Sequence, residues 1–247
     1  MLIFNPKRHV ITKLIPRSID YKRLCLYRGN VEIDAIASFV HHKVNAFDRM
    51  KQSNINKVQI VRKIIEVLSN IKLLKCRSDN TKSIKSELCK IGLKLGYDIE
   101  GNGFSKVFAE EHKLINVEWL YDQMWFKQER PYKILRLVLA AEIEWDGRRR
   151  LKTGSLDKDK YGAVKYDFQK LITSTSDIQV MVFKERHNES FERVVQDYFL
   201  PQIKDYKNST EGTYILLFAF CRKNFKYVLF HKIKSEVKSI MRYPQLS

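Results

Sequence analysis

The feature that most constrains the fold is a run of five apolar residues, Leu137 to Ala141, which ends in Glu142 and Glu144. Such a run predicts a β-strand buried on both faces. The two-residue period of a strand places Glu142 and Glu144 on the same side of the sheet. Two neighbouring, partly dehydrated carboxylates repel each other unless a divalent cation or a basic group neutralises them. We therefore expect a metal ion at this strand end.

A third carboxylate, Asp122, lies in the preceding segment. Residues Asn116 to Lys127 and Lys133 to Trp145 are rich in aromatic, β-branched and leucine residues. Pro131 between them suits a turn, so we predict an antiparallel hairpin. A register centred near Pro131 brings Asp122 opposite or diagonal to Glu142, close enough to share an ion. The residues that alternation predicts to face away from Asp122 are Trp119, Tyr121 and Gln123.

The N-terminal region, residues 1–78, is predicted to be a basic helical extension. Val31 to Met50 is compatible with a helix. Asn56 to Leu74 carries apolar residues at three- and four-residue intervals, and Ser53 or Asn54 is a suitable N-cap. These helices precede the core region, which we place at residues 79–247.

A linker and a further helix are predicted at the start of the core. The polar stretch Cys76 to Ser83 is typical of a linker. The apolar stripe that follows, from Ile84 to Leu95, predicts a helix, and Gly96 suits the position just after its end. Glu87 lies beside this stripe and could reach the carboxylate sheet, although a Glu beside a buried face is more often solvated.

The C-terminal half alternates between helical and strand patterns. A polar loop after Trp145 holds four cations next to the carboxylate strand, where a phosphate backbone would approach: Arg148, Arg149, Arg150 and Lys152. The elements predicted after it are a helix over Lys160 to Thr173, a strand over Asp177 to Lys184, a helix over Glu189 to Tyr206, and strands over Tyr214 to Phe220 and Phe225 to Lys232. This order predicts an α/β (mixed α+β) fold with a central mixed sheet flanked by helices.

The charge balance indicates a polyanionic partner. Lys and Arg outnumber Asp and Glu by 46 to 28, which gives a net charge of +18. This excess favours nucleic acid, with DNA and RNA both open. A membrane partner is disfavoured, because the longest apolar run, Tyr214 to Cys221, is too short to span a bilayer. The four cysteines have no metal-ligand spacing, and a cytoplasmic location is expected.

The order helix, strand with Asp, strand with ExE, helix, strand resembles the PD-(D/E)XK nuclease superfamily, the fold of many restriction endonucleases. The resemblance covers about Lys82 to Lys184 and includes the segments EWLYD, AEIEW and YDFQKLI. It aligns Asp122 and Glu142 with the family's acidic residues. The family's usual Lys is replaced here by Glu144, as in a subset of restriction enzymes with a second acidic residue.

The resemblance implies Mg²⁺-dependent hydrolysis of DNA phosphodiester bonds, with Mn²⁺ as a substitute metal. Asp122, Glu142 and Glu144 would hold the metal, which activates water and neutralises charge at phosphorus. Lys170, or less favourably Lys165, could replace the missing lysine from the following helix. Asp167 lies beside Lys170, off that helix's apolar stripe.

Three interpretations of the sequence remain. The favoured one is a DNA endonuclease of restriction or mobile-element defence. Cleavage of both strands with one site per chain would favour a symmetric homodimer, but no segment identifies its interface. The alternative is a nucleic-acid-binding protein of the same fold without catalysis. In the third, the protein is a structural basic protein whose strand acids only form ion pairs with nearby arginines.

Overall fold

The chain divides into two units, Met1–Lys51 and Gln52–Ser247. The computed structural model describes residues that all lie in the second unit: 57–116, 120–130, 133–145, 155, 158–185, 191–207, 212–221, 224–233 and 236–243. The predicted helix over Val31 to Met50, the caps Ser53 and Asn54, and the cations Arg148, Arg149, Arg150 and Lys152 lie outside these residues.

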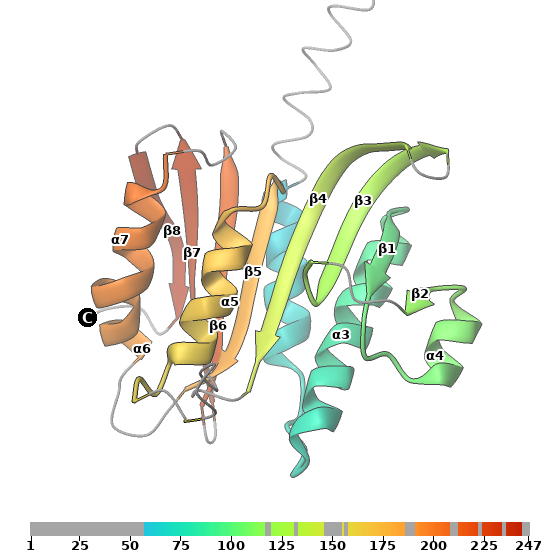
Figure 1. Ribbon diagram of the computed structural model, residues 1–247, viewed down its shortest axis with the longest axis horizontal. Helices are drawn as coiled ribbons and strands as arrows, with labels where there is room; N and C mark the ends of the chain where they lie inside the picture. The colour runs from blue at the N-terminus through green and yellow to red at the C-terminus, as the bar shows by residue number, and fades with distance from the viewer. Residues whose placement is uncertain are drawn as a thin grey trace, which may run out of the picture. The chain divides into compact units, whose positions relative to one another are not determined.

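A mixed sheet forms the centre of the described structure (Figure 1). Its strands run in the order β2-β1-β3-β4-β5-β6-β7-β8. Their bounds are β1 Asp98–Gly101, β2 Ile115–Asn116, β3 Gln123–Arg130, β4 Lys133–Glu144, β5 Ile178–Lys184, β6 Thr213–Phe220, β7 Phe225–Ile233 and β8 Glu236–Tyr243. The middle strands β4, β5 and β6 are parallel, and the β3–β4, β6–β7 and β7–β8 pairs are antiparallel.

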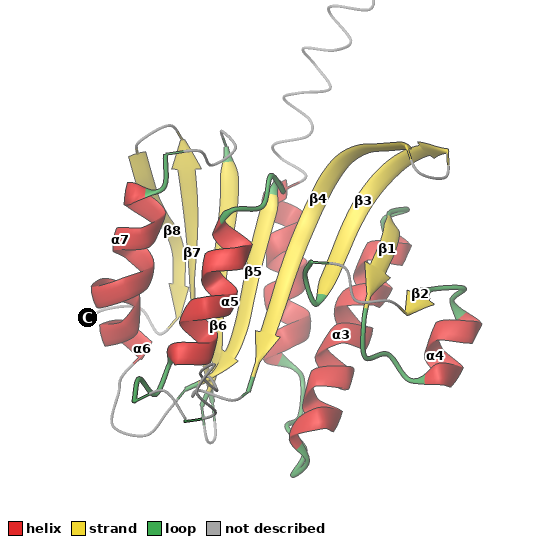
Figure 2. Ribbon diagram, viewed as in Figure 1, coloured by secondary structure: helices red, strands yellow, loops and turns green. Residues whose placement is uncertain are grey.

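Helices cover both faces of the sheet (Figure 2). Their bounds are residues 57–69, α3 Arg77–Lys94, α4 Lys106–Glu111, α5 Gly162–Ile172, α6 Phe191–Val194, the π-helical turn η2 Val195–Phe199 and α7 Leu200–Asp205. Residues 57–69 and α3 enclose one hydrophobic cluster with the sheet. A second cluster lies on the opposite face, under α5 and residues 191–205. The predicted class, a mixed sheet flanked by helices, is confirmed.

The helix predicted over Asn56 to Leu74 is present at residues 57–69. Its apolar stripe is buried, with Val61, Ile64 and Leu68 fully inaccessible to solvent. At its start, Lys57 Nζ lies 2.8 Å from Asp177 Oδ1, next to the first residue of β5. The helix therefore belongs to the same packed unit as the sheet, although the sequence placed it in the N-terminal extension.

The linker predicted over Cys76 to Ser83 is wrong, because α3 already begins at Arg77. Asn80 explains the difference. Its side chain is buried, accepts a hydrogen bond from the Leu74 amide at 2.6 Å and donates one to the Leu74 carbonyl at 3.0 Å. The polar residues of this stretch thus tie the preceding turn to the helix. Composition alone cannot distinguish such a segment from a linker.

The end of α3 is predicted correctly. Gly96 has φ +75°, the left-handed conformation that glycine adopts without a Cβ penalty. Its amide donates to Leu93 O at 2.9 Å, and the Tyr97 amide donates to Gly92 O at 3.0 Å. This pair of bonds is a Schellman motif. It ends the helix and turns the chain directly into β1.

The predicted hairpin is confirmed as β3 and β4, but β3 begins later than expected. Asn116 belongs to β2, which pairs with β1, and Asp122 lies in a bend just before β3. The predicted alternation around Asp122 therefore fails. Tyr121 packs in the cluster under α5, whereas Gln123 faces α3, where its amide fits the Lys85 carbonyl and the Cys89 amide. Trp119 lies outside the described residues.

The predicted elements from α5 to β7 are all present, and each begins and ends within two residues of its expected bounds. The buried stripe of α5 is as predicted, since Val164, Phe168, Leu171 and Ile172 are buried. Four elements were not predicted: β1, α4, β2 and β8. They are short, or, in β8, mostly exposed to solvent, so they lack a strong apolar period.

Candidate functional site

Asp122 and Glu142 occupy opposing positions of the β3–β4 hairpin, but their side chains have partners from opposite faces of the sheet, Lys85 of α3 and Lys170 of α5. Gln123 pairs with Ala141, so the next position outward brings Asp122 opposite Glu142. This register is the one that the sequence predicts. The bend before β3 keeps Asp122 beside β4, where its Oδ2 accepts a hydrogen bond from the Ile143 amide at 2.8 Å.

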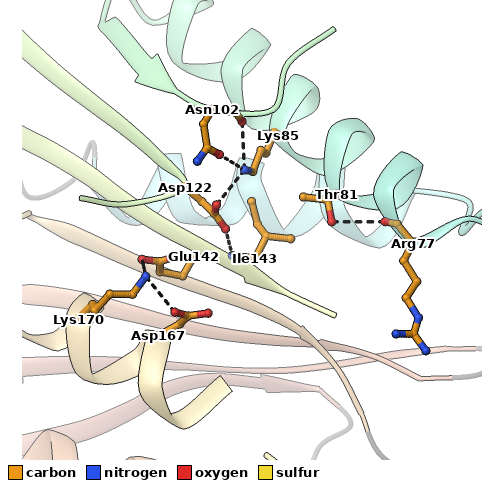
Figure 3. Close-up of polar contacts among 9 residues, drawn as sticks. All are labelled: Arg77, Thr81, Lys85, Asn102, Asp122, Glu142, Ile143, Asp167 and Lys170. Carbon is orange, nitrogen blue, oxygen red and sulfur yellow. Dashed lines mark hydrogen bonds and ion pairs between the residues drawn. The ribbon is translucent and has the colours of Figure 1, made fainter. Parts of the chain in front are cut away.

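The other oxygen of Asp122 is paired with a buried lysine (Figure 3). Lys85 Nζ, which comes from α3, lies 2.8 Å from Asp122 Oδ1. The same ammonium donates to the Asn102 carbonyl at 3.0 Å and to the Asn102 side-chain oxygen. Lys85 is only 3% exposed. Three acceptors for its three N–H groups offset the cost of burying the charge, so Asp122 is held in one position.

Lys85 and Asn102 are site residues that the sequence analysis missed. A signal for Lys85 exists, because Lys85, Cys89 and Gly92 recur at helical spacing and all three are buried. Cys89 and Gly92 are small, so this face of α3 is easily overlooked beside the longer apolar stripe. Asn102 follows β1, an element that the sequence did not reveal.

Glu142 is a buried carboxylate with incomplete compensation. It is 2% exposed and points to the α5 side of the sheet. Burial, and then the negative charges of Asp122 and Asp167, raise the pKa of Glu142 to about 8, although Lys170 opposes this shift. Its Oε1 lies 3.0 Å from Lys170 Nζ. The contact is an ion pair whose geometry is not that of a hydrogen bond, so Oε1 accepts no hydrogen bond from the described residues.

Lys170 projects from α5 between two carboxylates (Figure 3). Its Nζ is 2.9 Å from Asp167 Oδ1 and 3.0 Å from Glu142 Oε1. Burial lowers the pKa of Lys170, but the hydrogen bond to Asp167 and the charge of Glu142 outweigh it and hold the pKa above its usual value. Lys170 is therefore a fixed ammonium at Glu142, in the position that the sequence predicts for it.

The arrangement leaves an excess of negative charge. Three carboxylates, Asp122, Glu142 and Asp167, are accompanied by two ammonium groups, Lys85 and Lys170. Burial, more than the neighbouring acids, raises the pKa of Glu142, and its Oε1 has the Lys170 ammonium at 3.0 Å as a partial compensation. Lys85 and the Ile143 amide already bind both oxygens of Asp122, and Lys170 contacts Oε1 of Glu142, so a divalent cation shared by the two acids would displace one of these ammonium groups.

Glu144 does not complete a three-carboxylate cluster. In the part of the chain that the structure describes, no three His, Cys, Asp or Glu side chains form a group that could hold a metal ion. Glu144 is half-buried and lies two positions beyond Glu142 on β4. The described residues therefore do not support the expectation that all three acids surround one ion, and Asp122 and Glu142 remain as the candidate metal ligands.

The remaining predicted residues lie away from this pair. Glu87 is an exposed-face residue of α3 whose Oε1 contacts Lys90 Nζ at 2.7 Å. Lys165 Nζ contacts Asp159 Oδ2 at 2.7 Å and lies over the Tyr198 ring. Neither Glu87 nor Lys165 has a described contact with Glu142. Of the two lysines of α5, Lys170 is the one that contacts Glu142.

No protein-family model, curated protein or solved structure matches this chain. Among the described helices, none has the length and apolar character needed to cross a membrane. The function is therefore argued from the residues around Asp122 and Glu142.

Proposed function

We propose that this protein is a Mg²⁺-dependent DNA endonuclease with a restriction-endonuclease-like core, for which Mn²⁺ can substitute. The observation that carries the proposal is the opposition of Asp122 and Glu142 across the β3–β4 hairpin, with Lys170 3.0 Å from Glu142. An acidic pair beside a fixed ammonium is the set of groups that phosphodiester hydrolysis requires.

The order of elements supports the same proposal. A helix, a hairpin with one acid on each side, a second helix and a parallel strand follow one another as α3, β3, β4, α5 and β5. This is the order on which the resemblance to the PD-(D/E)XK nucleases rests. The site lies near the carboxyl end of β4.

Asp122 and Glu142 would hold the metal, and the metal supplies a water nucleophile and neutralises charge on the phosphate oxygens. Lys85 and the Ile143 amide fix the orientation of the Asp122 carboxylate. Lys170 takes the role of the lysine that Glu144 replaces: its ammonium donates to a non-bridging phosphate oxygen or orients the attacking water.

The state of Glu142 makes metal binding pH-dependent. Because its pKa is raised to about 8, Glu142 is mostly protonated at neutral pH in the metal-free protein. A ligating carboxylate must lose its proton, so metal binding releases this proton. Metal affinity should therefore increase as the pH rises toward 8.

One observation favours the alternative of a nucleic-acid-binding protein without catalysis. Each acid of the pair already has a lysine partner, Lys85 for Asp122 and Lys170 for Glu142. Such pairs also form for structural reasons alone. In that case the basic chain would bind nucleic acid through its excess of positive charge, and the two acids would serve only to anchor α3 and α5.

The test is cleavage of supercoiled and linear DNA, and of RNA in parallel, with Mg²⁺, with Mn²⁺ or with EDTA. We expect metal-dependent cleavage that Asp122→Asn or Glu142→Gln lowers by several orders of magnitude, because the ion loses a ligand. Lys170→Ala should lower it less. Glu87→Gln, an exposed acid of α3, is the control and should leave cleavage unchanged.

Two outcomes decide against the nuclease. Metal-dependent cleavage that survives both carboxylate substitutions would belong to another site or to a contaminant. Salt-sensitive DNA binding without cleavage, together with no thermal stabilisation by Mg²⁺ alone, would support the non-catalytic alternative.

A further inference from the structure

A second polar site lies between the start of α5 and the helical segment 191–199. It is a pocket of about 330 Å³, and its walls come from the turn before α5, from α5 and from η2. These helices cover the same face of the sheet as Lys170 and Glu142. The site is separate from the acidic pair, since neither Lys170 nor Glu142 lines it.

The pocket carries an excess of positive charge. Lys158, Lys160, Lys165 and Arg193 line it, together with the carboxylates of Asp159 and Asp197. Both carboxylates are already neutralised within the pocket wall. Asp159 pairs with Lys165 at 2.7 Å, and Asp197 pairs with Arg193 at 3.4 Å. The described contacts pair neither Lys158 nor Lys160 with a carboxylate, so these two ammonium groups make up the excess.

The wall that presents Lys158 and Lys160 is fixed. Between them, Asp159 Oδ1 accepts a hydrogen bond from the Tyr161 amide at 2.8 Å, and the Asp159 carbonyl accepts one from Gly162 at 3.1 Å. Across the pocket, the Tyr198 hydroxyl donates to the Lys165 carbonyl at 3.1 Å. These bonds order the backbone of the turn and tie α5 to η2, so Lys158 and Lys160 extend from an ordered backbone at the edge of the pocket.

The start of α5 adds to the positive potential of the pocket. An α-helix places partial positive charge at its N-terminus, and α5 is 11 residues long. Beside that end lie Lys158 and Lys160, which have no carboxylate partner among the described residues, and they suit a phosphate group, whose oxygens accept several hydrogen bonds.

We propose that this pocket binds a backbone phosphate of the nucleic-acid strand that the acidic pair acts on. The choice of a polynucleotide rests on the proposed function. Gly162, at the start of α5, and Lys170 are eight positions apart, which is about 12 Å along a helix axis. That length corresponds to between three and four base-pair steps of duplex DNA at ~3.4 Å each. One strand can therefore reach both sites.

The experiment measures binding of fluorescent duplex and single-stranded DNA in EDTA, where no cleavage occurs. The pocket variant is Lys158→Gln/Lys160→Gln, and the matched control is Lys106→Gln/Lys238→Gln, which removes two exposed lysines elsewhere. We expect the pocket variant to bind at least about tenfold more weakly and to reduce the salt slope by about one to two. The control should change affinity by less than about twofold.

A second variant, Lys158→Arg/Lys160→Arg, keeps the charge and should retain binding. If the pocket variant binds as the control does, while both melt like the wild type, the inference is wrong. A free nucleotide offers the same phosphate chemistry, so dAMP and inorganic phosphate are titrated separately. Saturable binding of either that depends on the pocket lysines, with DNA binding unchanged, would overturn the assignment to a polynucleotide.

These results separate the pocket from the acidic pair. Wild-type protein that never cleaves, with DNA binding that depends on Lys158 and Lys160, would disprove the nuclease and keep the pocket. An active nuclease whose pocket variant binds and cleaves like the control would keep the nuclease and disprove the pocket.

Discussion

Glu142 combines deep burial with a carboxylate oxygen that lacks a hydrogen bond. A buried acid in this state costs folding free energy when it is ionised. Ionised Glu142 therefore lowers the free energy of unfolding of the protein. Lys85 and Lys170 limit this cost without removing it, because Asp167 also lies within reach of Lys170.

In metal-free buffer, this cost predicts a pH-dependent stability. The pKa of Glu142 is about 8 in the folded protein, against 4.5 for an exposed Glu. Because the folded pKa is raised, the stability that Glu142 contributes is complete below about pH 4.5 and is lost as the pH rises to about 8. Glu142→Gln cannot ionise, so above pH 8 it should be more stable than the wild type by about 2 kcal/mol.

Urea unfolding in EDTA at several pH values between these limits checks this expectation. The difference between Glu142→Gln and the wild type should grow with pH. Glu87→Gln serves as the exposed control and should show a constant difference. A constant difference for Glu142→Gln as well would mean that Glu142 is ionised throughout this range.

At the residue scale, the sequence predicted that Asp122 lies opposite Glu142 from the hairpin register, and that Lys170 could reach Glu142 from the following helix. It did not predict Lys85 or Asn102. Their contacts depend on how α3 and the loop after β1 fold over the hairpin, and that packing has no local signature.

At the element scale, α3 anchors the site because it packs very closely on the sheet. A Cβ added to Gly92 would lie 2.7 Å from Ile99 Cδ1 and 2.9 Å from the buried ring of Trp125. Such distances are too short for carbon atoms in contact. Gly92 therefore allows the approach that brings Lys85 to Asp122.

Gly92→Ala should destabilise the protein by about 1–3 kcal/mol, since the added methyl group displaces Trp125 or the helix. The change is opposite to that expected from helix propensity, which favours Ala by about 1 kcal/mol. Denaturant unfolding measures it, with Lys90→Ala on the exposed face of α3 as the comparison. A stabilised Gly92→Ala protein would show that α3 can move away from the sheet at little cost.

Long elements were predictable from sequence and short ones were not. The helix at 57–69, α5 and the strands β4 to β7 have clear apolar periods, and their buried residues follow those periods. The sequence did not predict the first turns of α3, because Asn80 there is a polar residue that is buried through hydrogen bonds and so gives no apolar period. The strands β1 and β2 are defined by their pairing, which sequence patterns do not report.

At the scale of the whole molecule, the net charge of +18 predicts strongly salt-dependent binding to nucleic acid. If six or more phosphates are contacted, affinity should fall about a thousandfold or more between ~50 and ~200 mM salt. Titrations over that range measure the slope for duplex DNA, for single-stranded DNA and for RNA. An affinity insensitive to salt would show that the basic residues do not form the binding surface.

The parallel centre of the sheet has a consequence for how the protein is made. The three strands β4, β5 and β6 are far apart in the sequence, so their pairing closes long loops and gives a high contact order. The β3–β4 hairpin is synthesised before β5 and β6. The edge of β4 that pairs with β5 therefore stays unpaired until β5 has left the ribosome. Folding should therefore be slow for a chain of this size. Nascent chains that stop before residue 213 should depend on chaperones to remain soluble.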